Sequence, residues 1–149
     1  MTETCAQCGF DAHDYTHQDL LGTLRALAPM WRTMTEGMPA DVLSAKSSPE
    51  TWSAIEYAAH SRDVTEAMGR LLHFALSTDA PRIETPPPEP PTPVPAASMR
   101  EAINILERDV ARLHDRAAKL SDAGWERAFV VAGDELGRAS CRERVFRTV

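Results

Sequence analysis

His60 is the first candidate for chemistry in this sequence. At about 100° per residue of helix, His60 shares one face with apolar side chains and points into a helical bundle. These neighbours are Trp52, Phe74, Ala67, Leu71 and Val64. Glu56 and Asp63 flank it at i−4 and i+3. An inward imidazole between carboxylates fits a metal ligand, because its other nitrogen needs an acceptor. A core histidine satisfied by one carboxylate fits the same pattern.

A second cluster, Cys5, Cys8, His13 and His17, has the spacing C-x2-C-x4-H-x3-H. Its first part matches a zinc knuckle, in which two thiolates and an imidazole bind tetrahedral zinc. Other interpretations stay open. His17 also fits a core or capping residue, while Cys5 and Cys8 fit packing residues or a thiol pair that oxidises reversibly. His73 and His114 fall on polar faces, which predicts surface positions.

The composition sets limits on the class of protein. The chain has 149 residues, of which 43% are hydrophobic and 26% are charged, as expected for one domain with a core. Its net charge of −6 disfavours nucleic-acid binding, including a zinc-knuckle binder built on the cysteines. The sequence shows neither an apolar run of about 18 residues nor an export signal, so we expect a cytoplasmic protein with no membrane partner.

Three amphipathic segments predict long helices. The first runs from Thr16 to Met38, with Pro29 expected to kink or break it. The second starts with Ser48 as N-cap and Pro49 as first residue and runs to about Ser77. Ser98 caps the third, which should end near Gly124. The third helix has an apolar stripe: Met99, Ala102, Ile103, Leu106, Val110, Leu113, Ala117 and Leu120. Beyond it, Trp125 should cover the bundle end, with Phe129, Val130 and Val131.

The segment between the second and third helices is rich in proline. Residues 81–95 hold eight of the eleven prolines, which predicts an extended crossover rather than a helix or a central strand. Long helices and one long crossover favour an all-α helical bundle, in which a fourth helix should begin after Gly133.

The last residues have a different character. Residues 137–149, GRASCRERVFRTV, contain four arginines and no helical apolar stripe. Gly137 to Val145 matches the translation of a common sequencing-adapter sequence, so we interpret residues 137–149 as a non-native tail. The alternative is a natural basic tail that binds an acidic partner. This interpretation leaves residues 1–136 as an incomplete bundle domain and gives Cys141 no functional meaning.

A family resemblance bears on these candidates. The stretch Trp52 to Val64, WSAIEYAAHSRDV, resembles the actinobacterial type of the DinB-like (DinB/YfiT) superfamily, as do the CAQCGFD opening and the proline-rich crossover. The resemblance covers about residues 5–136. Mycothiol-dependent maleylpyruvate isomerase and bacillithiol transferases belong to this superfamily. It implies a four-helix bundle that binds a divalent metal through a histidine on the second helix and an H-x-x-x-H or E-x-x-x-H pair on the fourth.

The resemblance assigns the second-helix position to His60, while the family-like sequence stops at Leu136, before the other ligands. It implies a metal-dependent enzyme, using zinc or nickel, in which the metal activates a small thiol such as mycothiol for transfer or isomerisation of an electrophile. Glu56 or Asp63 would support His60 or accept a proton. The truncated chain itself is then expected to be inactive. The alternative is a non-catalytic stress or interaction protein of the same fold, and in either case we expect a homodimer.

Overall fold

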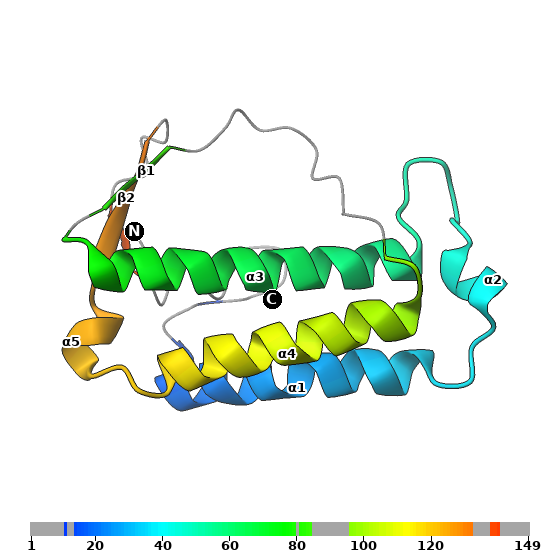
Figure 1. Ribbon diagram of the computed structural model, residues 1–149, viewed down its shortest axis with the longest axis horizontal. Coiled ribbons are helices and arrows are strands. Elements are labelled where there is room, and N and C mark those ends of the chain that lie inside the picture. Colours follow the sequence, from blue (N-terminus) through cyan, green and yellow to red (C-terminus); the bar gives the residue numbers. More distant parts are fainter. Residues whose placement is uncertain (1–10, 12–13, 80, 85–95, 133–137, 141–149) are drawn as a thin grey trace.

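Three long helices form the body of the computed structural model, which describes residues 11, 14–79, 81–84, 96–132 and 138–140. They are α1 (His17–Thr35), α3 (Ala54–Ser77) and α4 (Met99–Ala117). Two short helices are α2 (Ala40–Ser44) and α5 (Asp122–Trp125). Figure 1 shows α3 and α4 running in the same direction, with α1 running the opposite way beside α4. The predicted helical class is therefore confirmed.

A small sheet accompanies the helices and was not expected from the sequence. Its strands are β1 (Arg82–Glu84), β2 (Ala128–Ala132) and β3 (Arg138–Ser140), in the order β1-β2-β3. β1 pairs with β2 in parallel, and β2 pairs with β3 antiparallel. The edge position of β1 suits a proline-rich crossover, because prolines cannot donate to a central ladder. Gly133 and Cys141 lie outside the described residues.

Reciprocal caps define where two of the long helices begin. Thr16 caps α1 with Asp19, and Ser53 caps α3 with Glu56, each pair forming a capping box. The predicted start at Ser48 is wrong. A capping box needs Glu or Gln three residues after the N-cap, but the residue three after Ser48 is Thr51. The Ser48 and Thr51 hydroxyls instead form a hydrogen bond of 2.9 Å within a turn.

The other helix limits agree in part with the prediction. Ser98 caps α4 as expected, its hydroxyl accepting from Glu101 N. The helix ends at Ala117 rather than near Gly124, because Ser121 caps a separate short helix, α5. α1 continues through Pro29 without the break considered above. One short helix, α2, was missed.

The core lies between the three long helices. Leu20, Leu24 and Leu106 are its largest fully buried side chains. A second buried group joins α2 to the starts of α3 and α4: Leu43, Ala58, Met99, Ala102 and Ile103. Trp125 is only 4% exposed and covers one end of the bundle, as predicted. The predicted stripe of α4 is buried from Met99 to Ala117, and Leu120 packs against it.

The buried face of α3 differs from the predicted one. Its buried residues are Ala58, Ala59, Arg62, Thr65, Leu72 and Ala75. Val64, Ala67 and Leu71, predicted to point inward, are only half-buried, and Phe74 is 41% exposed. Small side chains let α3 approach its neighbours closely. The more apolar stripe is thus less buried than these small residues, which a hydrophobicity pattern alone cannot reveal.

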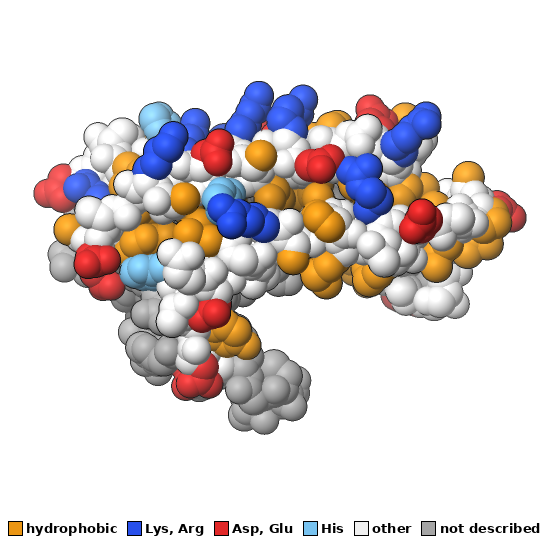
Figure 2. Space-filling view, turned by 90° about the horizontal axis from the view of Figure 1, so that it is seen from below, with side chains coloured by type: hydrophobic (Ala, Val, Ile, Leu, Met, Phe, Trp, Pro, Cys, Tyr) orange, Lys and Arg blue, Asp and Glu red, His pale blue; other side chains and the backbone are white. Residues whose placement is uncertain are grey.

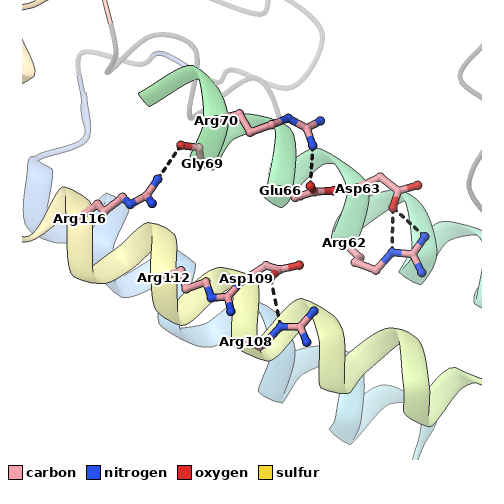
Figure 3. A network of polar contacts seen from close by, with 9 residues as sticks. All are labelled: Arg62, Asp63, Glu66, Gly69, Arg70, Arg108, Asp109, Arg112 and Arg116. Atoms are coloured by element: carbon pink, nitrogen blue, oxygen red, sulfur yellow. Dashed lines mark hydrogen bonds and ion pairs between the residues drawn. The ribbon is translucent and has the colours of Figure 1, made fainter. Parts of the chain in front are cut away.

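Charged side chains line one side of the α3–α4 contact (Figure 3). Arg62 and Asp109 are the most deeply placed, each with about 10% of its side chain exposed. Arg108 donates to Asp109 and Arg116 donates to the carbonyl of Gly69 on α3, at 3.2 Å. Ion pairing makes burial of these charges tolerable, because an unpaired buried charge would be strongly destabilising.

Candidate metal-binding site

His60 lies in the second turn of α3, half-buried, with its ring in a T-shaped contact with Trp52. The two ring centroids are 5.1 Å apart and the planes meet at 69°. Trp52 also contacts Tyr57, with centroids 5.4 Å apart. Trp52 precedes the cap and Tyr57 is the fourth helical residue, which is the geometry of a hydrophobic staple. The staple that fixes the start of α3 therefore also packs against the candidate ligand.

Glu56 takes part in the helix start. Its carboxylate accepts from Ser53 N at 2.7 Å and forms an ion pair with Lys46 at 2.8 Å. The hydrogen bond from Lys46 is the main reason why the pKa of Glu56 lies below its usual value, followed by the bond from the Ser53 backbone. These contacts stabilise the anionic carboxylate at the cap, and none of them reaches His60.

Asp63 is paired with its neighbour. Its Oδ1 accepts from both Nε and Nη2 of Arg62, each at 2.7 Å. These two contacts orient the Asp63 carboxylate toward the Arg62 guanidinium, which is nearly buried. A supporting role toward His60 stays a prediction for both Glu56 and Asp63.

Of the other predicted ligands, only His17 is described, and it lies away from His60. His17 is the first residue of α1 and its ring stacks on Trp125, with centroids 4.4 Å apart and planes 12° from parallel. It lies at the end of the bundle opposite the start of α3 (Figure 1). Cys5, Cys8 and His13 lie outside the described residues. Within the described part of the chain, no three His, Cys, Asp or Glu side chains are grouped to hold a metal.

The fit to a metal is therefore incomplete. A catalytic zinc usually has three protein ligands, and the described residues hold no group of three such side chains around His60. A metal bound by His60 would need its other ligands from outside the described residues.

His114 is a buried polar residue that the sequence analysis placed wrongly on the surface. It is 8% exposed, its Nδ1 lies 3.6 Å from the Asp115 carboxylate, and its Nε2 has no hydrogen-bond partner among the described residues. Val110, His114 and Ala117 are spaced i, i+4 and i+7 on α4, so they share the buried face. This spacing could have identified His114 as a buried residue from the sequence. His73 is exposed, as predicted.

The fold and the site together define a helical-bundle protein with one candidate metal ligand on its second long helix. The chain belongs to the DinB superfamily, whose family model matches residues 12–147. This match continues past Leu136 and so marks no boundary there. No helix in the described part is long and apolar enough to cross a membrane.

A solved structure supports the fold. The crystal structure of the mycothiol-dependent maleylpyruvate isomerase is similar to this chain with a TM-score of 0.60 and 18% sequence identity. The similarity covers 92% of this chain and 57% of that protein, so the chain spans little more than half of its length. At this identity the likeness establishes the fold alone. None of the curated protein sequences matches the chain.

Proposed function

We propose that this chain belongs to a DinB-type enzyme that binds a divalent metal, which would lower the pKa of a small thiol used to transfer to, or isomerise, an electrophile. His60 supplies one ligand. The observation that carries the proposal is the place of His60 on α3, half-buried and packed on Trp52, in a chain of the DinB superfamily. The metal is zinc or nickel, and mycothiol is the thiol we favour, because the similar solved structure is a mycothiol-dependent enzyme.

The remaining ligands are proposed to come from a natural continuation after Leu136. A fourth helix carrying two ligands at i and i+4 would place both on one face, where they can join the same coordination shell as His60. Metal binding would supply a lower thiol pKa. The chain's own contribution is to hold the His60 imidazole through the aromatic contact with Trp52.

The test uses a version of the protein in which the natural reading frame follows Leu136. We expect His60→Ala to weaken zinc or nickel binding at least about tenfold, because loss of one ligand leaves the site incomplete. His73→Ala is the matched control, since His73 lies exposed on the same helix. Metal content is measured by mass spectrometry after dialysis. Equal metal content in the wild type and His60→Ala would overturn the assignment.

A non-catalytic bundle protein is the second candidate. Glu56 and Asp63 are engaged by Lys46, Ser53 and Arg62, which suits a structural role for this region. If the metal is confirmed, turnover of mycothiol with a panel of electrophiles favours the enzyme, and its absence favours the second candidate.

We also propose that the protein is a homodimer that associates through α1 and α2. Four large apolar side chains there are about half exposed: Met30, Met34, Met38 and Val42. Figure 2 shows that hydrophobic side chains reach the surface over much of this side of the molecule, with Lys and Arg gathered along one edge. Exposed apolar surface of this kind commonly marks an interface.

A further inference from the structure

An open pocket lies at the end of the bundle where α1 ends, α2 follows and α4 begins (Figure 1). Its volume is about 430 Å³, within the range of small-molecule sites. Leu43, Met99 and Ile103 contribute its apolar surface, and all three are buried in the second core group. An apolar floor of this kind favours a ligand with a hydrocarbon or aromatic body.

Polar groups on α4 line the same pocket. Arg100 and Asn104 are four residues apart, so they share one helix face. In the part of the chain that the structure describes, neither side chain makes an ion pair or a hydrogen bond. Arg32, from α1, also lines the pocket, but Glu107 binds it at 2.7 Å. Arg100 and Asn104 are therefore available to a ligand.

The start of α4 adds to the preference for an anion. Ser98 caps the N–H of Glu101, and Ala102 N donates the first helical hydrogen bond, to Ser98 O. The earlier N–H groups, those of Met99 and Arg100, precede that bond and belong to the positive end of the helix dipole. The positive end of the α4 dipole and the Arg100 guanidinium therefore both attract an anion.

We propose that this pocket binds a small monocarboxylic acid with an apolar body. The body lies on Leu43, Met99 and Ile103, and the carboxylate is held by Arg100 and Asn104. Glu36 lines the pocket as well, and its negative charge disfavours a second carboxylate on the ligand. The inference uses neither His60 nor a metal, so it stands or fails independently of the proposed function.

The test is titration with phenylacetate and hexanoate, followed by NMR shifts of the Ile103 and Met99 methyl groups. Phenylacetamide is the neutral counterpart, and we expect it to bind at least about tenfold more weakly than phenylacetate. Arg100→Met should weaken phenylacetate binding by a similar factor, and Asn104→Asp should do so by charge repulsion. Arg112→Met, an exposed arginine farther along α4, should bind as the wild type does.

Circular dichroism verifies that each variant remains folded. All three variants change exposed side chains of α4, so the helix should persist. Equal binding of phenylacetate and phenylacetamide would overturn the proposal. So would wild-type affinity in folded Arg100→Met and Asn104→Asp, methyl shifts confined to other regions, or no shift with either acid at tens of millimolar.

Discussion

Removal of the Ser53 hydroxyl should destabilise the protein through the start of α3. Ser53 is 4% exposed, and its Oγ accepts from Glu56 N at 3.3 Å. Ser53→Ala removes this acceptor, while the Glu56 carboxylate still holds Ser53 N at 2.7 Å. Half of the capping box is lost, and the expected fall in the free energy of unfolding is about 1 kcal/mol. For a domain of this size the melting temperature should fall by about 2–4 °C.

Two serine variants are matched controls. Ser61 lies inside α3 and donates to the Tyr57 carbonyl, so Ser61→Ala should change stability by less than about 0.5 kcal/mol. The Ser48 hydroxyl forms its hydrogen bond with the Thr51 hydroxyl and caps no backbone N–H. Ser48→Ala should therefore also change the stability little. Urea denaturation followed by circular dichroism gives all three values. A large loss in Ser48→Ala with none in Ser53→Ala would refute the assigned cap and restore the start predicted from sequence.

Two further predictions concern charge and association. The pKa of Glu56 is lowered mainly by Lys46, so its contribution to stability is present above the ordinary pKa of 4.5 and is lost as pH falls through the lower folded value. Urea denaturation at stepped pH below 4.5 should show a smaller loss in Glu56→Gln than in the wild type, and parallel curves would contradict this. Met34→Glu should convert a homodimer into monomers by placing a charge in the apolar interface. Sedimentation velocity checks it, with Thr23→Glu on the same helix as control, and dimers that persist in Met34→Glu would reject this surface.

The sequence was most informative where one face of a helix is buried by several neighbours. The stripe of α4 was predicted from Met99 to Ala117 because large apolar residues recur at helical spacing, and the Ser98 cap followed from residue type. α3 was harder, because it packs through Ala58, Ala59 and Ala75, whose small side chains give a weak hydrophobic signal. The sheet depends on pairing between β1 and β2, segments far apart in the sequence, and short strands carry little local signal.

The sequence predicted the candidate site only in part. His60 could be placed on a helix face, but its contact with Trp52 depends on where the helix begins. A start at Ser48 would have put Trp52 inside the helix. The observed start at Ser53 puts Trp52 just outside the helix, where it contacts both Tyr57 and the His60 imidazole. The position of the cap therefore determines the surroundings of the candidate ligand.

This dependence connects Glu56 to His60 without direct contact. Lys46 and Ser53 hold the Glu56 carboxylate at the helix start, the start fixes Trp52, and Trp52 packs on the His60 ring. Each contact lies within the described part of the chain and none requires a metal. A ligand that is already oriented loses less conformational entropy when a metal binds. Glu56 therefore helps to fix the helix end from which the imidazole is presented, while its direct support of the imidazole stays a prediction.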